Sequence, residues 1–126
     1  MAFPGTYNFN YYAGDTFEFF VYPKNSSGGI FDDLADYDPN FVIATARGSA
    51  SAAVLSSTDP LELDATVVDG EYVSCTILPD GGRQLTNATY LYDLEIENTN
   101  AESPSFGKIF TLLTGTITVT QDVARI

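Results

Sequence analysis

The chain has 126 residues, the length of one domain, and we predict a single domain over residues 1–126. Seventeen acidic and five basic residues give a net charge of −12, which repels phosphate backbones and anionic lipids, so nucleic acid and membrane surfaces are excluded as expected partners. The absence of histidine excludes Ser-His-Asp and Cys-His nucleophiles and imidazole metal ligands. No stretch approaches the ~18 apolar residues of a membrane span.

The first third of the chain alternates apolar and polar residues with a period of two. Residues 7–12 and 16–22 are rich in aromatic side chains, which favours two strands. Gly14 and Asp15 lie between them and suit a tight turn. The sequence therefore predicts that these two strands form a hairpin.

The middle of the chain is less regular. Residues 30–39 are predicted to form an acidic loop or turn, and residues 41–47 a further strand. Residues 48–57 are rich in Ser and Ala and are compatible with either a long loop or a poorly patterned strand. A short strand is predicted at 61–63 and a turn at 67–71.

Residues 71–78 form a well-patterned strand in which Val73, Cys75 and Ile77 share one face. Cys75 is the only cysteine, so an intramolecular disulfide is impossible. Its neighbours are Ser74 and Thr76, which bring no positive charge to lower the thiol pKa. We predict that Cys75 is a small core residue rather than a nucleophile.

Two further strands follow a connection. Residues 79–87 are rich in turn formers and are predicted to cross between sheets, with one helical turn near 83–85. In residues 90–96 the tyrosines and aliphatic residues alternate with carboxylates, as in a half-buried strand. The last predicted strand pair, 108–114 and 116–120, is separated by Gly115, which indicates a bulge or bend.

Seven to nine such strands predict an all-β fold, an immunoglobulin-like antiparallel β-sandwich. In that fold a helical loop leads to a tyrosine whose hydroxyl bonds to upstream backbone, and Tyr90 is in the right order for this tyrosine corner. Tyr92 would then occupy the position of the second disulfide cysteine. The alternative is that Tyr90 is one more core aromatic residue.

Asp93 and Glu95 are the best candidates for catalysis by paired carboxylates. They share a strand face about 7 Å apart, a separation that fits inverting glycoside hydrolysis. No tryptophan is present to stack a sugar, so a solvated strand face is the preferred interpretation. We predict no catalytic residue.

An oxygen-rich cluster resembles the start of a calcium-binding EF-hand loop. Phe41 stands where that loop needs glycine, and Arg47 where it needs an acidic residue, so we predict no metal site and no cofactor. The cluster consists of Asp32, Asp33, Asp36, Asp38 and Asn40.

Aromatic residues are concentrated near the amino terminus, and one sandwich face can cover only half of them. We predict that part of this set meets a partner, since aromatic side chains are favoured interface anchors. The alternative is a thick core with ordinary surface tyrosines. The predicted interface residues are Phe3, Tyr7, Phe9, Tyr11, Tyr12, Phe20 and Tyr22.

Several short motifs together resemble a known family. They are Gly14-Asp-Thr, Phe31-Asp-Asp-Leu, Tyr90-Leu-Tyr-Asp-Leu-Glu, Gly107-Lys-Ile-Phe-Thr-Leu-Leu-Thr-Gly and Asp122-Val-Ala-Arg. In this order they resemble the small β-sandwich domains of tailed-bacteriophage tail-fibre and baseplate proteins. Val123-Ala-Arg departs from the Val-Thr-Arg ending of that family, and Asp33-Leu-Ala-Asp from its Asp-Leu-Thr-Gly turn.

The resemblance implies a non-enzymatic structural protein of the phage virion, an adaptor or assembly module of the tail, baseplate or fibre-attachment region. It would be made in the host cytoplasm, assemble as a symmetric homo-oligomer and bind other virion proteins without a cofactor. Alternatives are a capsid decoration (cement) protein and a carbohydrate-binding adhesion sandwich. An acidic glycosidase is the least favoured.

Overall fold

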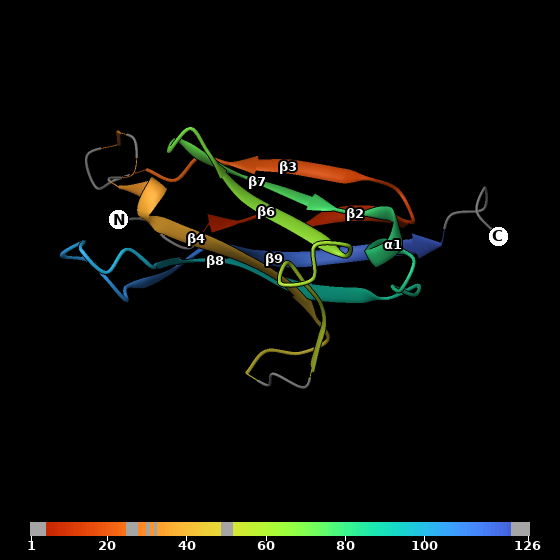
Figure 1. Cartoon of the computed structure of the whole chain (residues 1–126). Helices are drawn as coiled ribbons and strands as arrows, with labels where there is room; N and C mark the ends of the chain where they lie inside the picture. The colour runs from red at the N-terminus through yellow and green to blue at the C-terminus, as the bar shows by residue number, and fades with distance from the viewer. Residues whose placement is uncertain (1–4, 25–27, 30, 32, 49–51, 122–126) are drawn as a thin grey trace.

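The structure is a computed structural model that describes residues 5–24, 28–29, 31, 33–48 and 52–121, and these are mostly β-strand (Figure 1). Two short turns of helix interrupt the strands, the 3-10 turn η1 (Leu34–Asp36) and the α-turn α1 (Pro79–Gly82). No helix within the described residues is long and apolar enough to span a membrane. The strands are β1 (Gly5–Thr6), β2 (Phe9–Ala13), β3 (Phe17–Val21), β4 (Tyr37–Ala44), β5 (Ala53–Ser56), β6 (Leu63–Val68), β7 (Tyr72–Ile77), β8 (Thr89–Asn98) and β9 (Ile109–Gln121).

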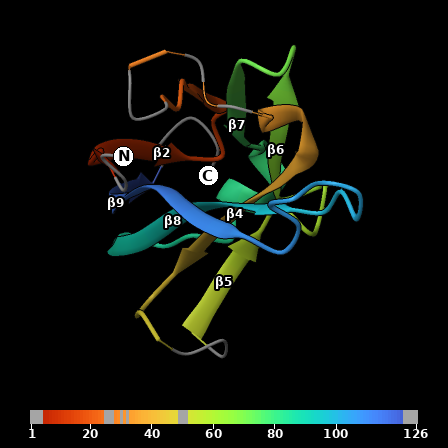
Figure 2. The same cartoon turned by 90° about the vertical axis from the view of Figure 1, so that its left-hand side faces the viewer.

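The strands form two sheets that pack face to face, which confirms the predicted all-β sandwich (Figure 2). The large sheet has the order β1-β9-β8-β4-β5, with β2 also paired to β9, and the small sheet has the order β3-β7-β6. This order corresponds to the immunoglobulin variable type, with the small sheet as strands B, E and D. Both β1 and β2 run parallel to β9, so the sandwich is not antiparallel throughout.

The predicted hairpin between the first two aromatic strands is wrong. β2 pairs with β9 in the large sheet, whereas β3 pairs with β7 in the small sheet. The turn at Gly14 does form, with φ of 96° and a hydrogen bond of 3.0 Å from the Asp15 N–H to the Tyr12 carbonyl. It carries the chain between sheets because the rings of Phe9 and Phe17 stack across the interior, their centroids 4.5 Å apart.

Several element boundaries also differ from the prediction. The undecided region after β4 contains a strand, β5, which pairs antiparallel with β4, while residues 49–51 lie outside the described part. Of the predicted strand at 61–63, residues 61–62 are a turn and Leu63 begins β6, while the following turn is shortened to residues 69–71. Asp69 and Gly70 both have positive φ, and an Asp-Gly pair suits such a tight turn because both positions require a left-handed backbone.

The helical turn in the crossing connection begins earlier than expected. α1 begins at Pro79, whose fixed φ and missing N–H suit the first helical position, rather than near Arg83. Gly81 and Gly82 let this turn pack closely, because a Cβ at Gly82 would lie 1.7 Å from the Tyr11 hydroxyl. The turn is thereby held against the core.

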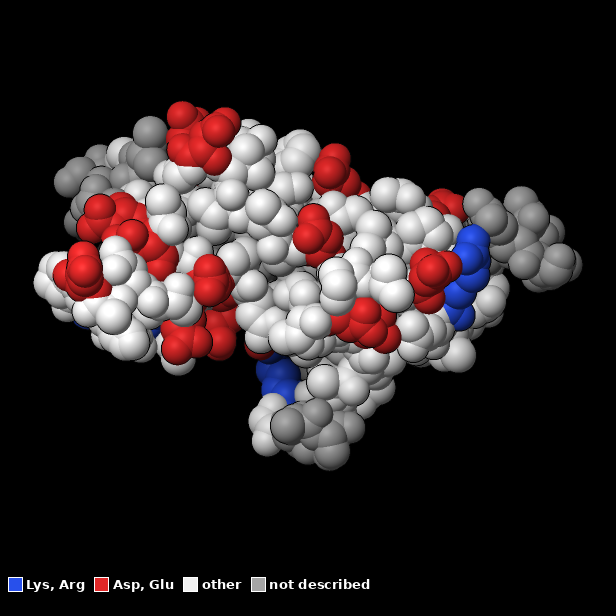
Figure 3. All heavy atoms as spheres, in the orientation of Figure 1, with Lys and Arg blue, Asp and Glu red and all other residues white. Residues whose placement is uncertain are grey.

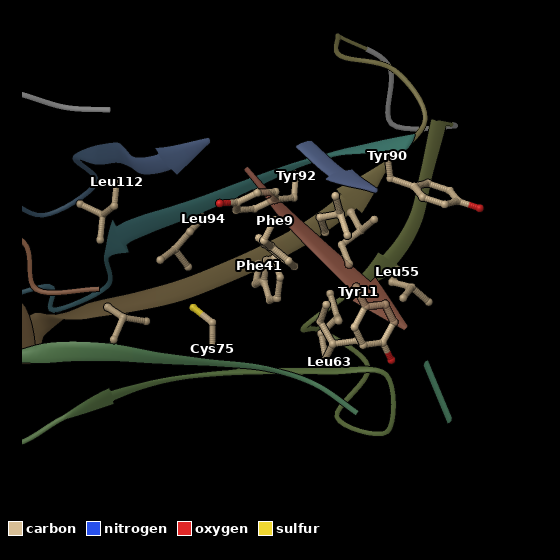
Figure 4. Packing of buried hydrophobic residues seen from close by; sticks show 14 of the residues in the cluster. Phe9, Tyr11, Phe41, Leu55, Leu63, Cys75, Tyr90, Tyr92, Leu94 and Leu112 are labelled. Carbon is tan, nitrogen blue, oxygen red and sulfur yellow. The ribbon is translucent and has the colours of Figure 1, made fainter. Parts of the chain in front are cut away.

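At the centre of the sandwich, aromatic rings occupy the place that a disulfide and a tryptophan take in antibody domains. Phe41 and Tyr92 are fully buried, with ring centroids 5.8 Å apart and planes at 82° (Figure 4). Phe19 from the small sheet meets both, at 5.6 Å from Phe41 and 6.2 Å from Tyr92. These edge-to-face contacts join the two sheets without a covalent bridge.

Gly115 is not the predicted bulge. The register shift between β8 and β9 falls at Leu94 and Glu95, and β9 runs unbroken through Gly115. Glycine is needed there for a close approach, because a Cβ would lie 2.0 Å from the Tyr7 carbonyl oxygen. That carbonyl accepts a hydrogen bond of 2.6 Å from the Tyr92 hydroxyl, which ties the amino-terminal strands to the core.

Candidate docking surface

The predicted interface residues fall into two groups. Phe9 is only 9% exposed and Tyr11 only 2%, so both belong to the core and neither is free to anchor a partner. The reason is that β2 pairs with β9 instead of forming the predicted hairpin with β3, so the face of β2 that carries Phe9 and Tyr11 points into the sandwich. The Tyr11 hydroxyl donates to the Asp15 carbonyl at 2.7 Å, and burial raises its pKa. Phe3 lies outside the described residues.

The other group lies at the surface. Exposure is 42% for Tyr7, 50% for Phe20, 53% for Tyr22 and 57% for Tyr12. Tyr12 is separate from the rest, because it pairs with Thr120 near the far end of β9, five residues or about 17 Å along the strand from Tyr7. The remaining three lie on or beside the edge strand β3.

Tyr72 is a member of this surface that the sequence interpretation did not include. It opens β7, and its ring lies 4.8 Å from that of Tyr22 and 5.5 Å from that of Phe20. The alternation of β7 placed Val73, Cys75 and Ile77 inward, so an outward Tyr72 could have been inferred. Only the pairing of β3 with β7 brings it beside Phe20 and Tyr22. We call Tyr7, Phe20, Tyr22 and Tyr72 the aromatic patch.

A shallow apolar groove of about 390 Å³ adjoins the patch, at the open margin between β3 and β9. Phe19 and Tyr7 meet there edge to face, with ring centroids 5.9 Å apart. The described residues that line it are all apolar or aromatic: Tyr7, Phe19, Phe20, Val21, Tyr22 and Leu113. A cleft of this composition gains free energy when an apolar side chain displaces its water.

The charged side chains lie outside the aromatic patch. Figure 3 shows carboxylates scattered across much of one face, with basic groups confined to a few small spots. Two of the basic side chains form ion pairs, Arg47 with Asp93 and Arg83 with Asp80. The aromatic patch and the described residues that line its groove include no ionised group, so they offer apolar contact on a strongly acidic protein.

Tyr90 lies near the start of β8, after the α1 connection. Its hydroxyl oxygen accepts a hydrogen bond of 3.0 Å from the N–H of Thr86, four residues upstream. The contact has the geometry of a tyrosine corner, so the ring is both a core residue and a clamp on the connection. Burial, followed by the charges of nearby groups, raises the pKa of Tyr92, whose hydroxyl donates to Tyr7.

The two side chains considered for catalysis, the Cys75 thiol and the Asp93 carboxylate, are buried or paired in the structure. Cys75 is fully buried, and desolvation, with a smaller contribution from Asp64, raises the pKa of its thiol to about 12. Such a thiol is almost entirely protonated at neutral pH. Asp93 is paired with Arg47, whose guanidinium also donates to the Thr114 hydroxyl.

The oxygen-rich segment is divided between η1 and β4. Asp36 accepts a hydrogen bond of 3.1 Å from the Asn100 side chain, and Asp38 lies opposite Glu97 in the sheet. Glu95 and Glu97 line a polar hollow with Asp38. Among the described residues no group of three or more acidic or cysteine side chains is arranged to hold a metal ion, and Asp32 lies outside them.

Comparisons with known proteins give little further information. No protein-family model matches the chain, and no curated protein matches it. Among solved structures, a family 123 glycoside hydrolase from Clostridium perfringens, studied for glycolipid glycan hydrolysis, aligns with 94% of this chain at 13% identity and a TM-score of 0.37. The chain spans 23% of the length of that enzyme. A likeness at this level supports no statement about activity.

Proposed function

We propose that this protein is a non-enzymatic assembly module of a tailed-bacteriophage particle, in the tail, baseplate or fibre-attachment region. Two independent observations support the proposal. The motifs in the sequence resemble those of small virion sandwich domains. The aromatic patch offers a docking surface that folding does not require, and the exposure of Phe20 on β3 and of Tyr22 directly after it is the observation that carries most weight.

The physical properties of the chain suit this role. Aromatic rings contribute much of the binding energy at protein interfaces when a partner removes them from water. The charge of −12 keeps free copies soluble until a complementary surface is offered. In a symmetric particle, neighbouring copies bind together, so a modest affinity for each contact becomes a durable attachment.

Purified particles of the phage that encodes this chain provide the test. We expect the protein to co-sediment with them in a density gradient, and replacement of both Phe20 and Tyr22 by Ser to reduce its incorporation at least tenfold, about 1.4 kcal/mol. Tyr12→Ser is the matched control, since that tyrosine is equally exposed but lies outside the patch. A protein that never co-sediments with particles ends the proposal.

Two other functions fit the same patch. A capsid decoration protein would give the same co-sedimentation, and labelled particles viewed by electron microscopy would place it on the head instead of the tail. A carbohydrate-binding adhesion sandwich is favoured only by the adjacent rings of Tyr22, which is exposed, and Tyr72, which is half-buried. Binding of the isolated protein to a glycan array, lost in Tyr22→Ala, would identify that activity.

A further inference from the structure

The edge strand β3 lacks the usual protection against pairing with another chain. Within the described residues it pairs with β7 alone, so every second backbone N–H and C=O points away from the sheet (Figure 1). Its five residues include three phenylalanines, its only charge is Glu18, and its register with β7 has no bulge. Natural proteins usually protect such an edge with Lys, Pro or a bulge.

The other edges differ from β3. β6, at the far side of the small sheet, carries one exposed carboxylate, Asp64, as β3 carries Glu18, but contributes no residue to the apolar groove. β5 has four residues and an irregular register with β4. Just before β2, the side chain of Asn8 accepts the Thr116 N–H at 2.9 Å in place of a backbone carbonyl. Among the edge strands that the structure describes, β3 is the one that combines a regular register with a place along the apolar groove.

We propose that β3 pairs antiparallel with β3 of a second copy of this chain, joining the two small sheets into one six-stranded sheet. The inference rests on the proposed role of the aromatic patch as a docking surface, and it does not depend on the phage assignment. Such an interface is isologous, because each copy contributes the same strand around a two-fold axis.

The sequence of β3 suits pairing with itself. With the two-fold axis at Phe19, Phe17 lies opposite the partner's Val21 and Phe19 opposite the partner's Phe19. Glu18 then lies opposite the partner's Phe20 instead of another Glu18, so the one charge on the strand meets no like charge. The outward phenylalanine of each copy is covered by the methylene groups of that glutamate.

The charges beyond the strand ends are complementary in the same register. Asp15 precedes β3 and Lys24 follows it, and both side chains are exposed. In the antiparallel pair, Lys24 of one copy comes within one residue position of Asp15 of the other, at both ends of the interface. These charge pairs favour the antiparallel orientation over the parallel one, which would bring like charges together, although each exposed pair is worth less than about 1 kcal/mol.

The first test is the association state of the full chain in solution. Analytical ultracentrifugation up to about 0.3 mM protein is expected to show a monomer–dimer equilibrium. Dimerisation should strengthen when salt is raised, because screening weakens the repulsion between two copies of charge −12. A chain that stays monomeric at low and high salt overturns the proposal, as does a dimer unaffected by Phe20→Glu.

Matched variants then test the edge. Phe20→Glu places a carboxylate opposite the partner's Glu18 and is expected to raise the dimer Kd at least tenfold, whereas Tyr12→Glu, on the other sheet, makes the same change in net charge and should leave the Kd far less affected. Both side chains are exposed, and circular dichroism melts would verify that both variants fold. An equal loss of dimer in the two variants would contradict pairing through β3.

The antiparallel orientation has its own test. Lys24→Asp is expected to raise the Kd by about threefold, because it brings like charges together at both ends. Adding Asp15→Lys to that variant restores opposite charges and should return the Kd toward the wild-type value. A double variant as weak as the single one would refute the antiparallel orientation.

The two proposals fail separately. A monomer that co-sediments with particles would refute only the β3 dimer, and its partner would then be a different virion protein. A dimer that never co-sediments with particles would refute only the phage assignment.

Discussion

The two faces of β3 place the same residue type in opposite situations. Phe19 points inward and meets Phe41 and Tyr92, whereas Phe20, the next residue, points outward and is half exposed beside Tyr72. The inner ring contributes to the free energy of folding through burial and packing. The outer ring contributes little to it, and in our proposal its exposed area is covered by a partner.

The sharpest test of this contrast removes one ring from the core that Phe19 contacts and one from the outer face of β3. Phe41→Ala should lower the free energy of unfolding by about 3–5 kcal/mol, because it leaves a cavity in a fully buried cluster. Phe20→Ala should change it by less than about 1 kcal/mol, since the ring is half exposed. Urea denaturation measures both. Similar losses in the two variants would mean that the outer ring is part of the core.

Gly115→Ala tests how the amino-terminal strands are attached to that core. The added methyl group would lie 2.0 Å from the Tyr7 carbonyl oxygen, so we expect a loss of about 1–3 kcal/mol from overpacking and from strain on the Tyr92 hydrogen bond. Thermal denaturation would measure it. Thr116→Ala is the control, because it alters the next residue without adding an atom near the Tyr7 carbonyl. Gly107→Ala is unsuitable, because that glycine has a positive φ and the substitution would strain the backbone.

Alkaline pH tests the burial of Cys75. The folded thiol titrates near pH 12 and the unfolded one near 9.0, so both states are protonated below pH 9 and this contribution to stability is fully present there. Between the two values the unfolded state alone loses the proton, so stability should fall by about 1.4 kcal/mol per pH unit.

Urea melts at pH 8 and pH 10 would measure this loss. The free energy of unfolding of Cys75→Ala should fall less steeply with pH than that of the wild type. The part of the slope that remains comes from the buried tyrosines Tyr11 and Tyr92, whose pKa values are also raised. An unchanged slope in Cys75→Ala would show that the thiol is not the responsible group. A thiol reagent should label the folded protein at pH 8 far more slowly than the protein in denaturant.

Tyr90→Phe has the smallest expected effect. It removes the hydroxyl that accepts the Thr86 N–H while keeping the ring in the core, and a loss of about 1 kcal/mol is expected. Tyr12→Phe, which removes an exposed hydroxyl from the neighbouring sheet edge, is the control. A loss no larger than that of the control would show that the corner contact does not stabilise the connection.

The alternation of residues allowed much of the fold to be predicted. It assigned β7 and β8, placed Cys75, Tyr92, Leu94 and Ile96 on inward faces, and led to the two-sheet sandwich. It did not assign strand partners, because the side-chain period of a strand is the same whichever neighbour it pairs with. The turn at Gly14 suited a hairpin, and only the stacking of Phe9 on Phe17 between the sheets shows why none formed.

For the docking surface, too, the sequence predicted one part and the tertiary structure decided the other. The sequence by itself determined that the amino-terminal strands hold more aromatic residues than one face can bury, since alternation sends neighbouring side chains to opposite sides. Tertiary structure decided which of them are exposed: it buried Phe9 and Tyr11, and it brought Tyr72 beside Phe20 and Tyr22. The physical reason is that local patterning sets the two faces of a strand, whereas contacts between distant segments decide which face meets water.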